Sequence, residues 1–298
     1  MRKMRRLLFI LLFLLLVSPC SAQTSRALLV GIQDYPKNSG WSQIHAHNDL
    51  QIVSATMRAA VVRDLRILRD AQATHAAIVS SMKQLSRDVK EGDRVLVFFS
   101  CHGQWITDTN ADEKAINPRD GYDESLIPYD AQISYNWRGR GYKGQNHLVD
   151  DELNLLLDGI CQRLGSKGQL LVLYDACQSG DLDRSETKEE TALRRGVKKP
   201  FVLHSDGKKT EKSAVPVSWI SISACRDVQN NYECVIEGTA YGRLAYSFCQ
   251  VFKPGITPND LVDGIQSIYD SLPTSDDKYV QELSKFIPEG KEKVALFK

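Results

Sequence analysis

The chain has 298 residues, of which 25% are charged and 42% hydrophobic, with a mean hydropathy of −0.31. This balance is typical of a soluble globular protein and excludes a disordered chain, a collagen-like repeat and a polytopic membrane protein. Four of the 38 Lys and Arg residues lie in the first six positions, so without residues 1–22 the chain carries 34 basic against 37 acidic residues. Nucleic acid is not an expected partner, because it requires clustered positive charge.

The N-terminus has the three-part pattern of a secretory signal peptide. Its basic residues precede an apolar run, Leu7–Val17, which is followed by Pro19 and the small residues Cys20 and Ala22. The run makes about 16 Å of helix, half of the ~30 Å hydrocarbon core, so no permanent membrane span is predicted. We expect residues 1–22 to be removed and the protein to be exported, to the periplasm or outside the cell. The alternative is lipidation of Cys20, but a proline directly before the cysteine, Pro19, suits lipidation poorly.

Short apolar runs alternate with helical patterns along the rest of the chain. The expected strands are Ala27–Ile32, Leu65–Leu68, Arg94–Ser100, Gln169–Tyr174 and Ser218–Ser223. The expected helices are Asp49–Val62, Thr74–Lys90 with Thr74 as N-cap, Asp150–Leu164 and Thr239–Phe252. Most of the strand runs are continuous, as in strands buried on both faces. The alternation predicts one α/β domain over residues 25–298, with a mostly parallel central sheet and helices on both faces.

Two long inserts interrupt this pattern, and long inserts in a compact domain are usually functional or disordered. Trp105–His147 is rich in aromatic, Gly and Asp residues, and we expect it to be ordered. Ser185–Ala214 is polar and has basic doublets at Arg194-Arg195 and Lys198-Lys199. We expect this second insert to be flexible and its backbone to be exposed.

The six cysteines beyond the signal peptide are too few for a disulfide-stapled scaffold, so stability must come from a hydrophobic core. Cys161 and Cys249 fall in helical apolar patterns and are expected to be small buried residues. Cys225 and Cys234 are placed to close a loop in an oxidising compartment, although sequence does not fix their pairing. Zinc is not indicated, because no Cys or His ligand spacing is present.

Reactive side chains follow two of the expected strands. Cys101, His102 and Gly103 follow one strand, and Asp175, Cys177 and a turn that contains Gly180 follow another. The carboxyl ends of parallel strands share one edge of a sheet, where ligands bind. A loop histidine or a buried thiol would each be unremarkable alone. Together they predict nucleophilic catalysis by a cysteine with an imidazole that moves the proton.

The motifs resemble those of the caspase-like clan of cysteine peptidases, and above all those of bacterial metacaspases, peptidase family C14. The matching segments are ALLVGIQDY (27–35), ND (48–49), FFSCHG (98–103), DGYDESLIPYD (120–130), VDDELNLLL (149–157) and YDACQSG (174–180). The resemblance implies a caspase-like fold. Two positions depart from it: Cys101 stands where glycine is usual, and Gln178 where histidine is usual.

The resemblance implies that Cys177 is the nucleophile and His102 the general acid and base. It also implies that the backbone N–H groups of Gly103 and Cys177 form the oxyanion hole. A glycine at position 103 suits this role, because it leaves room for a carbonyl oxygen beside fixed donors. No residue that orients the imidazole is evident in the sequence.

The resemblance further places Asp49, Ser100 and Asp175 in the pocket for the residue before the cut bond. Paired buried carboxylates select Arg or Lys, because a cation relieves their repulsion. The alternatives are that Asp49 is a helix N-cap and Asp175 a turn former. Substrates are therefore expected to be peptides or proteins with Arg or Lys before the cut.

Calcium is the one cofactor that the resemblance implies, and no organic cofactor is expected. The matching positions are Asp123, Asp150 and Asp151, with Asp183 a poorer match. Oxygen ligands in a loop and at a helix start suit Ca²⁺, but Asp150 and Asp151 would also stabilise a helix N-terminus without any ion.

The sequence therefore predicts an exported, monomeric cysteine endopeptidase that cuts after Arg or Lys through a thioester. A caspase-fold binding or scaffold protein that has lost turnover is the first alternative, supported by Cys101 and Gln178. A different thiol hydrolase or transferase on a similar sheet is the second.

Overall fold

A computed structural model describes most of the chain. The described ranges are 23–60, 62–109, 121–135, 141–176, 194–197, 199–204, 217–226, 229–272 and 281–298. The expected signal peptide, Cys177, Gln178 and Asp183 lie outside these residues.

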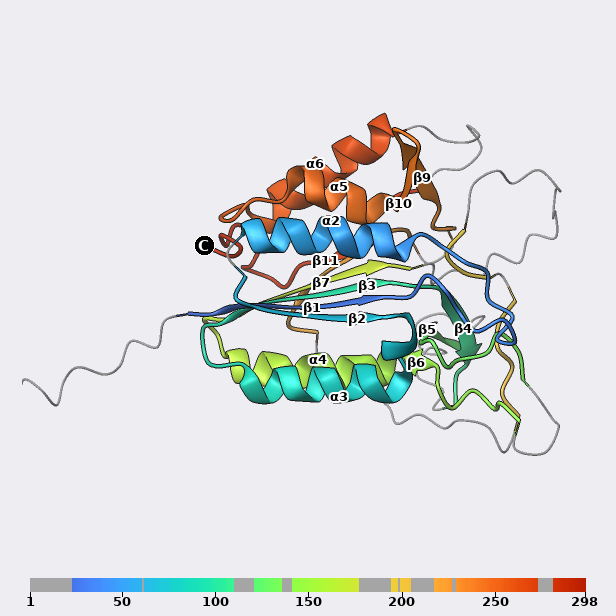
Figure 1. Ribbon diagram of the computed structural model, residues 1–298. Coiled ribbons are helices and arrows are strands. Elements are labelled where there is room, and N and C mark those ends of the chain that lie inside the picture. Colours follow the sequence, from blue (N-terminus) through green and yellow to red (C-terminus); the bar gives the residue numbers. More distant parts are fainter. Residues whose placement is uncertain are drawn as a thin grey trace, which may run out of the picture.

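A six-stranded sheet forms the centre of the molecule, in the order β11-β8-β7-β3-β1-β2 (Figure 1). Its strands are β1 (Ser25–Gly31), β2 (Asp64–Arg69), β3 (Arg94–Ser100), β7 (Gln169–Asp175), β8 (Ile220–Ser223) and β11 (Ser284–Phe286). Adjacent strands are parallel, except that β11 is antiparallel to β8. The predicted mostly parallel α/β sheet is confirmed.

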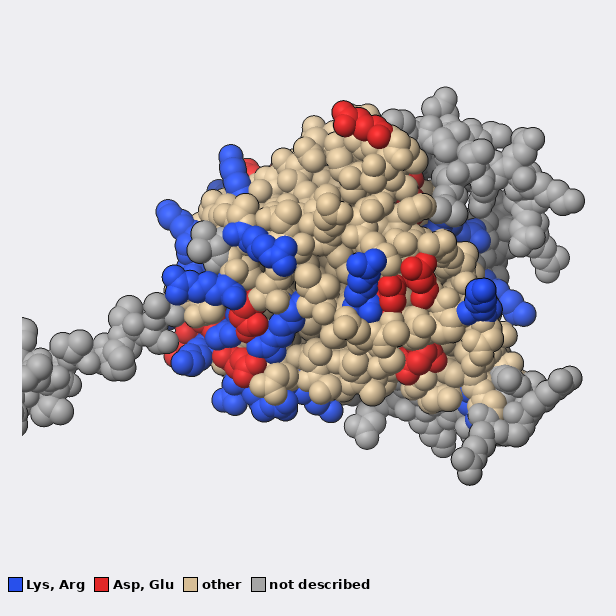
Figure 2. Space-filling view, in the orientation of Figure 1, with Lys and Arg blue, Asp and Glu red and all other residues tan. Residues whose placement is uncertain are grey.

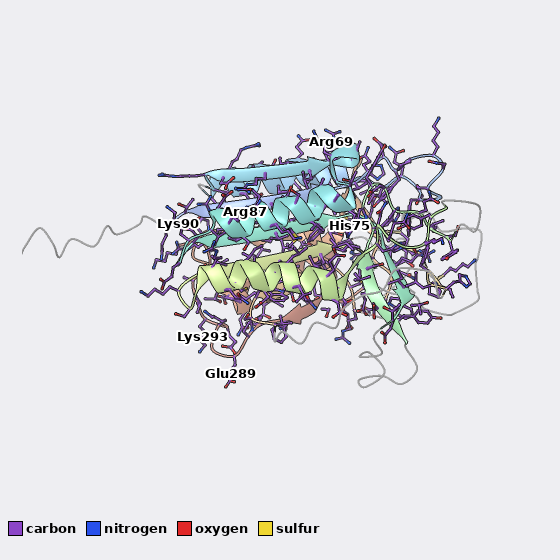
Figure 3. All side chains as sticks on the ribbon, turned by 90° about the horizontal axis from the view of Figure 1, so that it is seen from below. Arg69, His75, Arg87, Lys90, Glu289 and Lys293 are labelled. Atoms are coloured by element: carbon purple, nitrogen blue, oxygen red, sulfur yellow. The ribbon has the colours of Figure 1, made fainter. Side chains whose placement is uncertain are left out.

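Helices cover both faces of the sheet, as the sequence predicts (Figure 1). The helices on one face are α2 (Ala46–Ala59), α5 (Arg243–Val251) and α6 (Pro258–Ser271), and those on the other are α3 (His75–Asp88) and α4 (Asp150–Leu164). Figure 3 shows α3 and α4 side by side across the lower face, with Arg69 and His75 toward the carboxyl end of the strands and Lys90 at the opposite end. Thr74 caps α3, its side chain accepting a hydrogen bond from the Ala77 N–H at 3.2 Å.

Side chains that alternate along each central strand fill two cores. In β1, Leu29 packs with the α2, α5 and α6 side, and Leu28 packs with the α3 and α4 side. In β3, Phe98 packs with the α2, α5 and α6 side, and Phe99 packs with the α3 and α4 side. Both layers exclude water, so the sheet is a rigid support for whatever its strand ends carry.

A small antiparallel sheet, β4-β5-β6, lies beyond the carboxyl ends of the central strands (Figure 1). Its strands are β4 (Gly103–Thr107), β5 (Tyr122–Leu126) and β6 (Leu148–Val149). The first insert, of which residues 105–109, 121–135 and 141–147 are described, supplies β5 and most of β4. The sequence does not predict these strands, because their residues are mostly polar or aromatic rather than a continuous apolar run.

The predicted helix Thr239–Phe252 is too long at its start. Residues Thr239–Gly242 form strand β10, paired with β9 (Glu233–Ile236), and α5 begins only at Arg243. The Gly242 N–H is bound by a carboxylate of α2, which holds the chain extended at that point. The β9-β10 hairpin, α6, β11 and the short 3-10 helix Asp70–Gln72 are further elements that the sequence analysis does not predict.

Charged side chains on the face drawn in Figure 2 are mixed in sign toward its left end and sparse over its centre. Within the described residues, the helices are all too short or too polar to cross a membrane. Cys225 and Cys234, which the sequence places as a potential pair, are buried thiols rather than a disulfide.

Candidate active site

Strands β3 and β7 end side by side and carry the predicted catalytic segments. Their register sets Ser100 level with Asp175. His102 lies two residues beyond the first of these positions, and Cys177 two residues beyond the second in the sequence. The described residues therefore confirm that both segments leave the sheet at the same edge, while Cys177 itself lies outside them.

The imidazole of His102 is held in a fixed orientation. It is stacked on the ring of Trp41, with 5.0 Å between the ring centroids. The ring of Tyr35 is tilted relative to the imidazole, and its centroid lies 5.2 Å away. The Tyr35 hydroxyl also accepts the His102 backbone N–H at 3.1 Å. His102 Nε2 lies 2.9 Å from the Ser42 carbonyl oxygen, which can only accept. The Ser42 carbonyl is thus the orienting group that the sequence does not reveal.

This contact fixes the tautomer of His102. Nε2 carries the proton that it donates to Ser42, which leaves Nδ1 as the unprotonated nitrogen. Among the described residues, Nδ1 has no hydrogen-bond partner. Burial lowers the pKa of His102 to about 4, although the Ser42 carbonyl partly opposes the shift. At neutral pH the imidazole is therefore neutral and able to accept a proton at Nδ1.

Cys101, the second thiol beside His102, is not equipped to compete as a nucleophile. Its side chain is 1% exposed and packs into the core on the α3 and α4 side. Burial raises the pKa of the Cys101 thiol to about 12, so it stays protonated. A buried protonated thiol is an inert packing group.

The residues predicted to bind substrate lie together in one buried pocket. Asp49 is in the first turn of α2, where it is not the N-cap, and Ser100 and Asp175 end β3 and β7. All three are 0% exposed. The Ser100 hydroxyl donates to Asp49 at 2.7 Å. We call this site the carboxylate pocket, with the further members Glu233 and Gly242 described below.

The carboxylate pocket holds an arginine of the same chain. Arg195, from the second insert, is 0% exposed. Its Nη1 lies 2.7 Å from Asp49 Oδ2 and 3.3 Å from Asp175 Oδ1, and it donates to the Ser100 hydroxyl at 2.9 Å. An arginine side chain thus occupies the position where the sequence analysis expects the side chain of a substrate.

Glu233, at the start of β9, binds the other edge of the guanidinium. Its Oε1 accepts from Arg195 Nη2 at 2.9 Å and from Nε at 3.2 Å. Glu233 is oriented in turn by His45, whose backbone N–H and Nδ1 contact its two oxygens. Sequence reasoning misses Glu233, because it lies in an apolar stretch after a loop and outside the recognised motifs.

Burial and the neighbouring charges shift the pKa values of Asp49, Glu233 and Arg195. Burial raises the pKa of Asp49 to about 6, against the attraction of Arg195, and the nearby Asp175 raises it further. Burial would also raise the pKa of Glu233, but Arg195 and His45 hold it below its ordinary value. Burial disfavours the charged guanidinium, yet the three carboxylates keep the pKa of Arg195 well above its ordinary range. The pocket therefore needs a cation.

The start of α5 completes the pocket. The Gly242 N–H donates to Asp49 Oδ1 at 2.9 Å, and the Ala245 N–H donates to Asp175 Oδ2 at 2.7 Å. Backbone donors at a helix N-terminus stabilise negative charge. A side chain on Gly242 would overlap the Asp175 carboxylate and lie 2.6 Å from Arg195 Nη1. Asp175 thus caps the N-terminus of α5 and also lines the carboxylate pocket.

The backbone of Arg195 is also bound on both sides. Its N–H donates to the Asn231 carbonyl at 3.0 Å, and its carbonyl oxygen accepts the Gly103 N–H at 3.3 Å. Gly103 is the residue expected to supply one oxyanion donor. The exposed backbone expected for the second insert is therefore wrong at Arg195 and Gly196, which are both buried. The reason is that the carboxylates retain the guanidinium in the interior.

The predicted calcium ligands lie away from these contacts, on the small sheet and the helix that follows it. Asp123 is in β5, and Asp150 and Asp151 begin α4 directly after β6, the partner of β5. Asp123 and Asp151 are 2% and 6% exposed. Their oxygens suit Ca²⁺, but across the described residues these three do not bring three ligand atoms within 4.8 Å of one another. Asp183 lies outside the described residues.

A different group, Asp34, His47 and Asp70, does bring three such atoms together. Its members already bind protein groups. His47 Nε2 contacts Asp70 at 2.5 Å and Nδ1 contacts the Arg69 guanidinium, while Asp70 accepts two backbone N–H groups. This cluster is a structural support for the loop after β1.

Comparison with known proteins places the chain among caspase-like peptidases. A family model for the metacaspase peptidase C14 domain matches residues 25–183. Metacaspase-1 of Schizosaccharomyces pombe is 26% identical over 259 residues, which cover 70% of this chain and 56% of that protein. Metacaspase-1 of Coccidioides immitis is 26% identical over 304 residues, covering 86% and 60%. The chain thus spans a little over half the length of these curated relatives.

A solved structure shares the fold. The crystal structure of protein GSU0716 from Geobacter sulfurreducens superposes with a TM-score of 0.61, covering 92% of this chain and 97% of that one. The two sequences are 19% identical. At this identity the likeness concerns the fold alone.

The electrostatic account of the carboxylate pocket predicts the effect of Arg195→Met. The variant should lose up to about 3–5 kcal/mol of stability at pH 7.5, because three buried carboxylates lose their cation. Without Arg195 the pKa of Asp49 rises above 6, so the folded variant takes up a proton that the unfolded chain, with a pKa near 3.8, does not. The loss should therefore shrink as the pH falls toward 5.

Urea unfolding at pH 7.5 and pH 5 measures both values, and Arg194→Met is the matched control, because Arg194 is partly exposed and makes no ion pair with these carboxylates. A loss that is equal at the two pH values would contradict the electrostatic account.

Proposed function

Because the chain belongs to the metacaspase peptidase C14 family, we propose that it is a cysteine endopeptidase that cuts after Arg or Lys by means of Cys177 and His102. The observation that carries the proposal is the placement of Arg195. Its side chain fills the carboxylate pocket while its carbonyl oxygen accepts the Gly103 N–H. Export directed by residues 1–22 is part of the proposal.

In the proposed reaction, His102 Nδ1 takes the Cys177 thiol proton, and the sulfur attacks the carbonyl carbon of the substrate Arg or Lys. The N–H groups of Gly103 and Cys177 stabilise the resulting oxyanion. When the C–N bond breaks, His102 gives its proton to the leaving amine, and a thioester to Cys177 remains. Water, deprotonated by His102, then hydrolyses the thioester and restores the thiol.

The geometry supports a preference for Arg over Lys. The guanidinium reaches Asp49 and Asp175 through Nη1, and Glu233 through Nη2 and Nε. A lysine ammonium is a single point charge and cannot contact both sides of the pocket at once. The planar fork of arginine therefore uses all three carboxylates.

We further propose that the first substrate is the chain's own Arg195–Gly196 bond. Among the basic residues of the second insert that the structure describes, Arg195 is the one in the carboxylate pocket. While it remains there, no other Arg or Lys can enter. Cutting this bond and withdrawing Arg195 would open the pocket to other proteins.

Substitution of the catalytic residues tests the chemistry. Cys177→Ala and His102→Ala should each lower hydrolysis of an Arg-terminated fluorogenic peptide by at least about a thousandfold, since each removes an essential group. Cys101→Ala should retain most of the activity, because that thiol is buried and protonated. Labelling with an irreversible thiol inhibitor gives a second readout. Failure of wild-type protein to hydrolyse or to be labelled would favour the binding-protein alternative.

Substitutions in the carboxylate pocket test specificity. Gly242→Ala should raise KM for Arg substrates at least tenfold, because the added methyl overlaps the Asp175 carboxylate. Gly159→Ala is the matched control, since its added methyl meets nothing closer than 3.7 Å. Glu233→Gln should reduce the ratio of Arg to Lys cleavage. A wild-type preference for acidic residues would overturn the pocket assignment.

Mass spectrometry of new N-termini tests the self-cleavage. Wild-type protein should yield a fragment that begins at Gly196, whereas Cys177→Ala and Arg195→Ala proteins should not. Arg194→Ala should still be cut. Parallel incubations with Ca²⁺ and with a chelator test whether the calcium that the resemblance implies, with Asp123, Asp150 and Asp151 as ligands, is needed for activity. A fully active wild-type chain that stays intact would exclude self-cleavage as the activating step.

A further inference from the structure

The chain beyond Arg195 is bound along the edge of the small sheet. Gly196 is bridged in parallel to Gly103, and Phe201 to Ile106, so both ends of the segment 196–201 lie against β4. The Phe201 N–H donates to the Trp105 carbonyl at 2.7 Å, and the Thr107 N–H donates to the Phe201 carbonyl at 3.0 Å. The two bridges are isolated, because the segment advances five positions between them while β4 advances three, but each uses main-chain contacts of the kind by which peptides bind sheet edges.

Phe201 anchors the far end of this segment. It is 1% exposed, and its ring lies 4.6 Å from that of His147, 5.6 Å from that of Tyr142 and 6.1 Å from that of Tyr135. We call the site formed by Ile106, Tyr135, Tyr142 and His147 the aromatic pocket. By contrast, the neighbouring Val202 is 49% exposed.

The aromatic pocket is joined to the backbone of the bound segment by a polar relay. The Tyr142 hydroxyl contacts His147 Nδ1 at 2.7 Å, and His147 Nε2 contacts Gln104 Oε1 at 3.1 Å. Gln104 Nε2 then donates to the Lys199 carbonyl at 2.8 Å. These buried groups hold the main chain of the segment between the two pockets.

In sequence, Phe201 is the sixth residue after the bond that follows Arg195. Two buried side chains, one charged and one aromatic, thus flank a main chain that runs past the Gly103 N–H. The charged anchor fits the carboxylate pocket and the aromatic anchor fits the aromatic pocket. Strand β4 connects the two pockets, because Gly103 at its start binds the Arg195 carbonyl and Ile106 near its end lies in the aromatic pocket.

We propose that the aromatic pocket is a second substrate-binding site, which recognises an aromatic residue six positions after the cut bond. This rests on the proposed function and extends it to the residues after the cut. Phe201 occupies the site in the intact chain and presents the Arg195–Gly196 bond. Protein substrates use the same site once Phe201 has left it.

Three peptides test the proposal. The first spans residues 191–203, the second has Ala in place of Phe201, and the third has Ala in place of Val202. Phe201→Ala protein that has first been left to cleave its own Arg195–Gly196 bond has both pockets open, and it should cut the first and third peptides with a kcat/KM at least tenfold above that for the second. Wild-type protein should show a smaller ratio, since its own Phe201 competes. Equal values for all three peptides in the Phe201→Ala protein would overturn the proposal.

A second measurement does not depend on the folding of the Phe201→Ala chain. Wild-type, Phe201→Leu and Val202→Ala proteins are purified with Cys177 blocked as a mixed disulfide, and the thiol is released with dithiothreitol. The fragment beginning at Gly196 should form several-fold more slowly in Phe201→Leu than in the other two, and equal rates would contradict the proposal.

A fluorogenic peptide that ends at Arg distinguishes failure of the proposed function from failure of the second substrate-binding site. It has no residues after the cut bond to reach the aromatic pocket. If wild-type protein does not hydrolyse it, the proposed function fails. If wild-type protein hydrolyses it and the three long peptides are cut equally, only the second site fails.

Discussion

The burial of one guanidinium among three carboxylates is the interaction on which the rest of the site depends. Charges removed from water are costly unless they are paired and hydrogen-bonded. Asp49, Asp175 and Glu233 meet this condition through Arg195 and through backbone donors at the start of α5 and at His45. The same condition selects the ligand. Under the proposed function, a site lined by buried carboxylates would repel acidic side chains and bind arginine.

The central sheet makes this arrangement possible. Two dry cores hold β3 and β7 in register, so Ser100 and Asp175 stand level where the strands end. The segments that follow lead to His102 and toward Cys177. Since the carboxylate pocket and the segment with His102 both begin at adjacent strand ends, the side chain of Arg195 can occupy the pocket while its carbonyl lies beside Gly103. Arg195 shows this coupling in a single residue, through its side chain and its carbonyl oxygen.

The strand pattern of the sequence predicts that the segments of His102 and Asp175 reach one edge of the sheet. The resemblance to metacaspases adds Asp49 and Ser100 to the pocket and gives Gly103 its role. Glu233 and the Ser42 carbonyl are not predicted, since they lie in a hairpin and a loop without a periodic signal, and Gly242 lies in a segment whose pattern predicts a helix where the structure has a strand. Arg195 is recognisable only as one basic residue among several. Arg195 is buried because it pairs with carboxylates that are distant in the sequence, whereas the polar composition of its own segment predicts an exposed residue.

Calorimetric titration with Nα-acetyl-arginine methylamide tests the central claim most directly. The Cys177→Ala chain, whose pocket is filled by Arg195, should not bind this ligand. The Cys177→Ala/Arg195→Ala chain should bind it, and adding Glu233→Gln should weaken that binding about tenfold. Absence of binding to the Cys177→Ala/Arg195→Ala chain, or equal binding with and without Arg195, would contradict the claim that these three carboxylates form an arginine site closed by the chain itself.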